Sequence, residues 1–376
     1  MAMRAGGAAL AVVLLGAVLV PGLAGAQPGV FVTPSFSIAE VYDDNLFFTP
    51  SRREKDLISR FSPGIQAGYQ SVPLTLLGRY TFDAEIYPDH PELDDAQVRQ
   101  EAGIEFRSRP NRTLTLSFDG AFLETQTPGQ LNVATGILVG RVRAQRLSAK
   151  PGVAYEFDPL TAGAAEYTLT EDELSGGVTI LTHVGDLRLD RRITPLDTGS
   201  VGYTLREFDF DPGGTTTSHA VTLGWTRQLT PLTSLTLRGG PRFSEGSVDP
   251  EVSASIRHRL RLGEVSFTYS RSQTTVIGRA GSVDNEAFIA TAVLEPLPSL
   301  EVRAAPSLLR TFDADREARV YALDLTAEYK ITAWLSLEGA YEFSFQEGGV
   351  NAIRDEEISH NIILLRLTVK QPYRIY

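Results

Sequence analysis

The stretch YALDLTAEYKITAWLSLEGAYEFSFQ, residues 321–346, decides the fold class. Apolar or aromatic residues alternate with polar ones in both halves, and ITAW interrupts the alternation between them. Tyr321 and Leu323, for example, would lie on one face of a strand, and Asp324 and Thr326 on the other. Because successive side chains of a β-strand point to opposite faces, the stretch predicts two strands joined by a short turn, each with one apolar and one polar face.

The same pattern recurs along most of the chain. SLTLRGG (234–240) and EVSFTYSRS (264–272) alternate in the same way, and helical periodicity is almost absent. A second recurring feature is a short break with a Pro-Leu core, which suits a tight turn because proline presets φ and cannot donate to a β-ladder. Pro-Leu breaks lie at Pro73, Pro159, Pro195, Pro231 and Pro296, and three other breaks lie at Pro110, Gly263 and Thr332.

Successive breaks lie about 36 residues apart over much of the chain. Repeats of this length also occur in propellers and solenoids. Each unit here, however, holds two alternating runs of 10 to 14 residues, whereas a propeller blade has four short strands. Two long runs and one variable loop fit a transmembrane β-hairpin, whose strands need about 9–11 residues to cross the bilayer.

The connections alternate in type along the chain. Those between the breaks are longer, polar and variable, and they span 42–56, 87–95, 125–140, 170–177, 211–218, 278–285 and 346–357. Short turns on one side and long loops on the other are typical of outer-membrane barrels. Eight short turns separate nine hairpins, so we expect an all-β antiparallel transmembrane barrel of about 18 strands (16–18), with the region 125–160 the hardest to assign. Aromatic girdle positions are expected for Tyr42, Phe47 and Phe48.

The first 26 residues, MAMRAGGAALAVVLLGAVLVPGLAGA, have the layout of a secretory signal peptide. An apolar run from Ala8 to Val20 follows a single Arg, and Ala24-Gly25-Ala26 offers the small residues of a cleavage site. The run is short for a transmembrane anchor, which needs about 20 residues. We therefore predict export, a mature chain of residues 27–376 that forms one barrel, and a location in the outer membrane of a Gram-negative bacterium.

Composition excludes several kinds of site. The absence of cysteine excludes disulfides and thiolate-bound zinc or iron–sulfur clusters. The net charge of −11, which loss of Arg4 makes −12, argues against binding of nucleic acid. A mean hydropathy of −0.08 fits a half-apolar barrel, with a soluble β-solenoid or secreted sandwich as the alternative. No metal or other cofactor is expected, since the histidines lack ligand spacing and are expected on the surface or in loops: His90, His183, His219, His258 and His360.

Two segments near the start, TPSFSIAEVYDDNLFFTP (33–50) and DLISRFSPGIQAGYQ (56–70), resemble the beginning of the beta-barrel porin 2 family. They share a proline-containing first strand, an aromatic-Asp-Asp-Asn corner and a later Pro-Gly. KPGVAYEFDPLTAGAAEYTLTEDEL (150–174) resembles an internal hairpin of that family. The resemblance implies an outer-membrane barrel. Because related barrels often accompany exopolysaccharide or exosortase gene clusters, it also implies a link to polysaccharide export.

If the apolar faces point at lipid, the polar faces line the lumen. On that assignment the lumen carries the basic residues Arg79, Arg99, Arg188, Arg206, Arg238, Arg257 and Arg366, and the acidic residues Asp83, Glu85, Glu101, Glu105, Asp190, Asp324, Glu328, Glu338 and Glu342. Such charges either pair across strands and keep the wall polar, or set a field that selects ions. Since acidic residues dominate the later strands, the first hypothesis is a porin-like channel for ions or small polar solutes with a weak cation preference.

Two other classes of function stay open. The first is a non-enzymatic component of exopolysaccharide or envelope export or assembly, with polysaccharide as the partner. The second is an enzyme, suggested by Asp89-His90 and Ser359-His360. It is the least favoured class, because adjacency in sequence does not give the geometry of a catalytic triad.

Further expectations concern the chain end and the interruptions of the pattern. NIILLRLTVKQPYRIY (361–376) alternates and ends in an aromatic residue, which resembles the signal read by the barrel-assembly machinery, but Pro372 puts the last ladder residue near Lys370. Loop 125–140, apolar in part, is the best candidate for a plug. Outer-membrane lipid is the other expected partner, and the oligomeric state stays open. Bulges or strand ends are expected at the strand prolines Pro63, Pro151 and Pro306.

Overall fold

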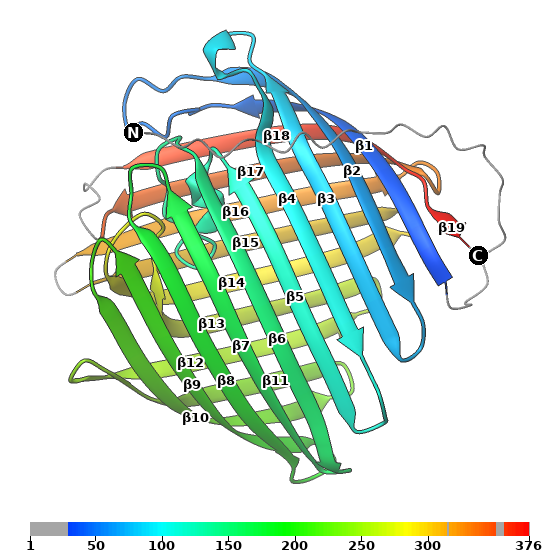
Figure 1. The fold of residues 1–376 in the computed structure, drawn as a ribbon, viewed down its shortest axis with the longest axis vertical. Coiled ribbons are helices and arrows are strands. Elements are labelled where there is room, and N and C mark those ends of the chain that lie inside the picture. Colours follow the sequence, from blue (N-terminus) through cyan, green and yellow to red (C-terminus); the bar gives the residue numbers. More distant parts are fainter. Residues whose placement is uncertain (1–28, 314–315, 351–356, 376) are drawn as a thin grey trace, which may run out of the picture.

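The computed structural model describes residues 29–313, 316–350 and 357–375, so the predicted signal peptide, residues 1–26, lies outside the described residues. In these ranges 18 strands form one closed antiparallel β-barrel, as the sequence predicts (Figure 1). The strands are β1 (Gly29–Asp43), β2 (Asp56–Gln70), β3 (Leu74–Ile86), β4 (Asp95–Ser108), β5 (Leu114–Thr125), β6 (Ala144–Asp158), β7 (Thr161–Leu174), β8 (Thr179–Arg192), β9 (Asp197–Asp211), β10 (Thr215–Thr230), β11 (Thr233–Ser244), β12 (Ser247–Leu260), β13 (Gly263–Thr275), β14 (Ser282–Leu297), β15 (Leu300–Phe312), β16 (Glu317–Lys330), β17 (Leu335–Gly348) and β18 (Ile358–Lys370).

The barrel closes between β1 and β18, which pair over nine residues starting at Ser35↔Lys370. A short additional strand, β19 (Tyr373–Ile375), continues along β1 in the register that β18 sets. Pro372 therefore lies in a gap of two residues and does not end the ladder. The prediction that the last ladder residue lies near Lys370 is wrong, because β1 begins early enough to pair with β19 as well.

All eight predicted breaks lie in, or within two residues of, the short turns of the barrel. The predicted loops 170–177, 211–218 and 278–285 are too long, since strands occupy much of each of them. Two further connections on the loop side, at 245–246 and 313–316, were not predicted. These connections are only two and four residues long, so neither has the long polar segment by which the other loops were recognised.

The three prolines at which bulges or strand ends were expected, Pro63, Pro151 and Pro306, cause neither. Pro63 pairs with Phe36 on β1, and only the ladder between β2 and β3 is interrupted there. Pro151 in β6 and Pro306 in β15 behave in the same way, and the register is identical on both sides of each gap. The N–H of a strand residue points toward only one neighbouring strand, so each proline interrupts one ladder and leaves the other intact.

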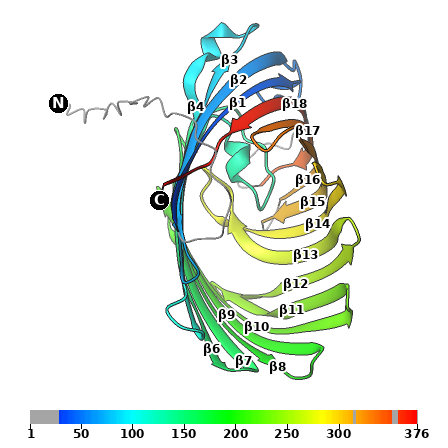
Figure 2. The same cartoon turned by 90° about the vertical axis from the view of Figure 1, so that its right-hand side faces the viewer.

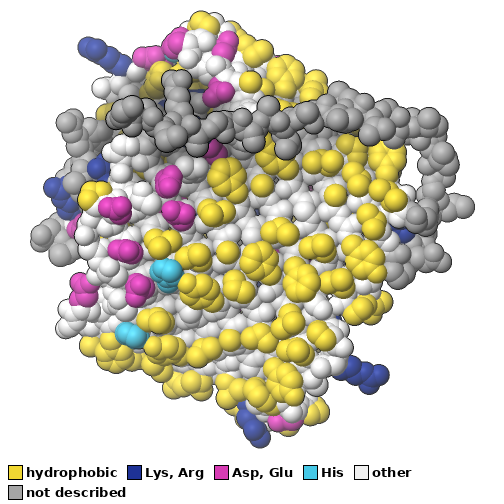
Figure 3. All heavy atoms as spheres, in the orientation of Figure 1, with side chains coloured by type: hydrophobic (Ala, Val, Ile, Leu, Met, Phe, Trp, Pro, Cys, Tyr) yellow, Lys and Arg dark blue, Asp and Glu magenta, His cyan; other side chains and the backbone are white. Residues whose placement is uncertain are grey.

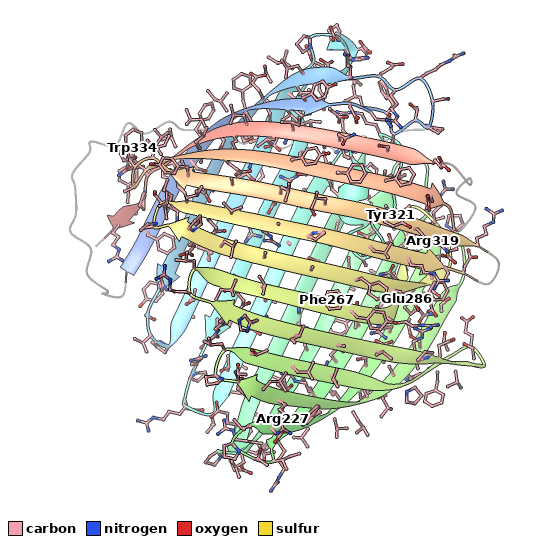
Figure 4. All side chains as sticks on the ribbon, turned by 180° about the vertical axis from the view of Figure 1, so that it is seen from behind. Arg227, Phe267, Glu286, Arg319, Tyr321 and Trp334 are labelled. Carbon is pink, nitrogen blue, oxygen red and sulfur yellow. The ribbon has the colours of Figure 1, made fainter. Side chains whose placement is uncertain are left out.

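The outer surface of the barrel is largely apolar, as a lipid-facing surface requires. Hydrophobic side chains cover most of the face in Figure 3, and acidic side chains gather toward the end that carries the loops. On the opposite side of the barrel, Phe267 and Tyr321 point outward from β13 and β16, with Trp334 near the turn end (Figure 4). In the part of the chain described by the structure, no helix is long and apolar enough to cross a membrane.

Candidate functional site in the barrel lumen

The connection between β5 and β6, residues 126–143, folds into the barrel. It contains the short 3-10 helix η2 (Pro128–Leu131), which lies inside the ring of strands (Figure 2). Ile137 is fully buried in a cluster with side chains of β14 to β16, such as Leu309 and Val320. Gly136 has a positive φ of 64°, and a Cβ there would lie 2.6 Å from Leu309 Cδ1. A glycine is therefore needed for this close approach, and the segment proposed as a plug lies against the inner wall.

Buried amide side chains hold this loop in place. Asn132 Oδ1 accepts a hydrogen bond from the Ile277 N–H (3.0 Å), and Asn285 Nδ2 donates to the Ala134 carbonyl (2.7 Å). On β17, Gln346 Oε1 accepts from the loop backbone at 2.8 Å. Each bond satisfies a polar group that would otherwise be costly to bury, so together they fix the loop in one position.

A second segment, the end of the β13–β14 hairpin, also lies in the lumen (Figure 2). Val276 and Ile277 are buried there, and Gly278 forms a β-bridge with Val178 from the β7–β8 connection. The hairpin end and loop 126–143 together narrow the loop side of the barrel. Sequence reasoning missed the hairpin end, because its residues read as an ordinary polar loop.

Hydrogen bonds and an ion pair connect loop 126–143 to β2 and β3. Arg141 donates to the Tyr87 hydroxyl (2.5 Å), Tyr87 donates to Glu85, and Arg60 pairs with Glu85 at 2.6 Å. Burial, followed by the neighbouring Glu85 carboxylate, raises the pKa of Tyr87, so the phenol keeps its proton and can donate. Tyr87 and Arg141 were not predicted, since both lie in connections.

Beneath the loop is a polar cavity of about 620 Å³. It is bounded by β1 to β5, by β16 to β18, and by Gln130 of the loop. The residues of its lining that had been predicted to face the lumen are Asp83, Arg99, Glu338, Glu342 and Arg366. Arg60 also lines it, and was missed because Ile58 and Ser59 interrupt the alternation of β2.

The arginines of the cavity are already paired with acids. Arg60 pairs with Glu85, Arg99 lies 2.8 Å from Glu101, and Arg366 lies 3.5 Å from Glu338. Ion pairs of this kind cancel much of the positive charge that the arginines bring to the lumen. Arg60–Glu85 and Arg366–Glu338 are cross-strand pairs of the kind expected for a polar wall, whereas Arg99 and Glu101 lie on the same strand.

Some carboxylates of β16 and β17 are not neutralised. Asp324 lies directly opposite Glu342, and Glu328 directly opposite Glu338. Among the described residues, Asp324, Glu328 and Glu342 have no cation within 4.0 Å, and Asp324 and Glu342 are exposed. Like charges directly opposite in a sheet are destabilising. This wall therefore presents a negative field to the cavity.

The remaining predicted residues lie elsewhere on the inner face. Arg238 and Arg188 line a smaller cavity of about 330 Å³, where Arg188 pairs with Asp190. Arg257 pairs with Glu264 at 3.1 Å near the turn end. Arg79 lies 3.6 Å from Glu101, Arg206 pairs with Glu251, and Glu105 lies opposite Asp119. The predicted set is thus distributed along the barrel and does not form a single site.

The aromatic-Asp-Asp-Asn corner joins the two closing strands. Asp43 binds His360 (2.8 Å), and Asp44 binds Asn361 at 2.7 Å. Phe48 packs on the His360 ring, with centroids 4.6 Å apart. His360 is buried, so its predicted surface position is wrong. The girdle position predicted for Phe48 is also wrong, because its ring packs on His360 at this corner.

The other corner aromatic and the other histidine considered for catalysis also have structural contacts. Phe47 packs edge-on against His90, so its predicted girdle position is wrong as well. His90 contacts Asp56 (3.0 Å) and Glu54 (2.9 Å), and the hydrogen bond to Asp56 raises the pKa of His90. These contacts tie together the first two connections on the loop side. Among the described residues, no group of three or more acidic or histidine side chains could hold a metal ion.

Comparisons with known proteins give a likeness of fold. No family model matches the chain, and no curated protein matches its sequence, so the resemblance to the beta-barrel porin 2 family stays a prediction. Among solved structures, OccAB4 of Acinetobacter baumannii matches 93% of this chain and 99% of its own, with 9% identity and a TM-score of 0.50. OpdO of Pseudomonas aeruginosa matches 93% and 98% with 10% identity and a TM-score of 0.48, and the siderophore receptor PirA of the same species matches 90% and 80% with 10% identity and a TM-score of 0.47. The chain is therefore similar in fold to OccAB4, and its fold is that of an outer-membrane β-barrel.

Proposed function

We propose that this protein is a passive channel of the outer membrane for ions and small polar solutes, with a weak preference for cations. The proposal rests on the polar cavity of about 620 Å³ beneath loop 126–143. A cavity of this size accepts a small hydrated solute. The apolar outer surface supports a location in the membrane, and the polar inner face supports passage of water-soluble molecules.

The cation preference follows from the charges that are left unpaired. Arg60, Arg99 and Arg366 are held by acids, whereas Asp324 and Glu342 face the lumen without a counter-ion among the described residues. Rings or rows of free carboxylates attract cations and raise their local concentration. The preference should be weak, because most of the wall carries both signs of charge.

The test is the reversal potential of a purified channel in a planar bilayer with a salt gradient. The variant Asp324→Asn/Glu342→Gln should move the reversal potential toward zero, since two lumen charges are lost. The control Glu207→Gln/Asp209→Asn removes the same two charges from exposed positions on the outer face of β9 and should leave the potential unchanged. Equal shifts in both variants, or no shift in the first, would contradict the proposed selectivity.

A further inference from the structure

The inner wall of the barrel carries a second cavity, the one of about 330 Å³ that Arg188 and Arg238 line. Its lining residues belong to β7 to β11, and we call it the wall recess. None of them belongs to loop 126–143 or to the end of the β13–β14 hairpin. The wall recess is therefore a feature of the barrel wall itself, separate from the cavity of about 620 Å³.

The middle of the wall recess is lined by small residues. Gly202 on β9 lies directly opposite Thr222 on β10. A Cβ at Gly202 would lie 2.8 Å from Thr222 Oγ1, so the glycine leaves the middle of the recess open. The Thr222 hydroxyl has no hydrogen-bond partner within the described ranges, so it can donate to or accept from a bound solute.

One end of the wall recess carries excess negative charge. Asp186 on β8 lies directly opposite Glu166 on β7, and Lys150 pairs with Glu166 at 2.9 Å. Thr204 donates a hydrogen bond to Asp186 (2.6 Å), but in the part of the chain that the structure describes no cation lies within 4.0 Å of the Asp186 carboxylate. One lysine for two carboxylates leaves one negative charge, which attracts an ammonium group.

The other end of the wall recess carries excess positive charge. Arg188 pairs with Asp190 at 2.9 Å. Arg238 on β11 is half-buried and lines the recess, yet it makes no hydrogen bond or ion pair with any described residue. A free guanidinium of this kind binds a carboxylate through two parallel hydrogen bonds.

The arginines next to Arg238 on the loop side are already paired. Arg206 pairs with Glu251 at 2.5 Å. Arg242, which is only 1% exposed, binds Asp284 at 2.5 Å. Neither guanidinium is therefore available to a solute, whereas that of Arg238 is.

The two unpaired groups lie too far apart to pair with each other. In the register of the sheet, Asp186 is level with Arg242, and Arg238 precedes Arg242 by four residues. Since β8 and β11 are three strand spacings apart, the Cα atoms of Asp186 and Arg238 are separated by about 19 Å, and side chains that share one recess shorten the gap to roughly 10 Å. An extended chain of three residues has a length of about 10 Å.

We propose that the wall recess binds short zwitterionic peptides, with the ammonium group at Asp186 and the carboxylate at Arg238. A single amino acid is too short to reach both groups, and the Thr222 hydroxyl lies where a peptide group would pass between them. The recess adds one charge of each sign to the lumen, so it leaves the cation preference to β16 and β17. The proposal rests on the proposed channel function and names a class of solute for it.

Equilibrium dialysis of radiolabelled triglycine against the purified, detergent-solubilised barrel tests the site. Asp186→Asn and Arg238→Gln should each weaken binding at least tenfold, because each removes the partner of one charged end. The control Glu301→Gln/Arg303→Gln removes one acid and one arginine from the inner face of β15, outside the recess, and should bind triglycine as the unmodified protein does. Equal binding to the unmodified protein and to both single variants would overturn the site.

Two blocked peptides assign each end of the solute to its residue. N-acetyltriglycine lacks the ammonium group, so its weaker binding should fall further in Arg238→Gln and stay unchanged in Asp186→Asn. Triglycine amide lacks the carboxylate and should show the reverse. If the unmodified protein binds all three peptides equally, the recess does not recognise the charged ends, and the proposal is wrong.

Dialysis separates this site from the channel function, because it needs no current. A protein that carries no current but binds triglycine through Asp186 and Arg238 would refute the channel and support the site. A protein that conducts but binds triglycine equally with and without these two side chains would support the channel and refute the site.

Discussion

Asn45 has no exposed surface, and its side chain makes three hydrogen bonds of 2.9 Å and accepts a longer one (3.4 Å) from the Thr49 hydroxyl. Its Nδ2 donates to the carbonyl oxygens of Thr49 and Ser359, and its Oδ1 accepts from the Thr49 N–H, each at 2.9 Å. Because Asn45 follows β1 and Ser359 lies on β18, a single side chain joins the two strands that close the barrel. The Asp-Asp-Asn corner of the sequence therefore connects β1 to β18 at the end of the barrel that carries the long loops.

At this scale, Asn45→Ala should lower the free energy of unfolding by about 1–3 kcal/mol, since buried backbone groups lose their partners. Urea unfolding in lipid vesicles, followed by the mobility difference between folded and unfolded protein on gels, would measure the loss. Asn111→Ala is the matched control. Asn111 Oδ1 accepts three hydrogen bonds, but Asn111 is exposed in a short turn, so water replaces them and the loss should be smaller. Equal losses of unfolding free energy in the two variants would contradict the role of Asn45 in joining β1 to β18.

Individual charges were only partly predictable from the sequence. Alternation alone assigned Arg99, Glu338 and Arg366 to the polar face, and all three line the cavity. It could not assign their partners, because pairing depends on register between strands. Arg242 was missed altogether, since its burial arises from the inward turn of a hairpin that follows it in sequence.

At the scale of elements, strands and turns follow from local chemistry. Proline and polar breaks predicted the eight short turns, and period-two alternation predicted the strands inside the apolar belt. The position of loop 126–143 could not be predicted in the same way. Its anchors lie far away in sequence, such as Asn132 with Ile277 and the loop backbone with Gln346. Only its apolar character suggested that it would avoid solvent.

The buried anchor of this loop gives a test. Ile137→Asp places an uncompensated carboxylate in the apolar cluster, which costs about 3–5 kcal/mol and should drive the loop off the wall. We expect higher single-channel conductance and faster cleavage of the loop by added protease. Val133→Asp puts the same charge on the same loop at a position that is 77% exposed, and it should change neither. If Ile137→Asp changes neither the conductance nor the rate of cleavage, the loop does not restrict the passage.

At the scale of the whole molecule, the number of strands determines the width of the barrel interior. Barrels of 16 to 18 strands are wide enough for an aqueous channel unless something fills them. Here the two inward segments narrow the loop side, and a polar cavity remains below them. The molecule therefore combines a wide barrel with a restricted passage, and the central claim is that this passage conducts.

The most direct measurement is the single-channel current of the purified protein in a planar bilayer with a potassium chloride gradient. We expect discrete, stable openings and a reversal potential whose sign shows a small excess of potassium over chloride flux. A protein that inserts as a folded, β-rich barrel but carries no current would contradict the channel. A reversal potential that favours chloride would contradict the role of the unpaired carboxylates on β16 and β17.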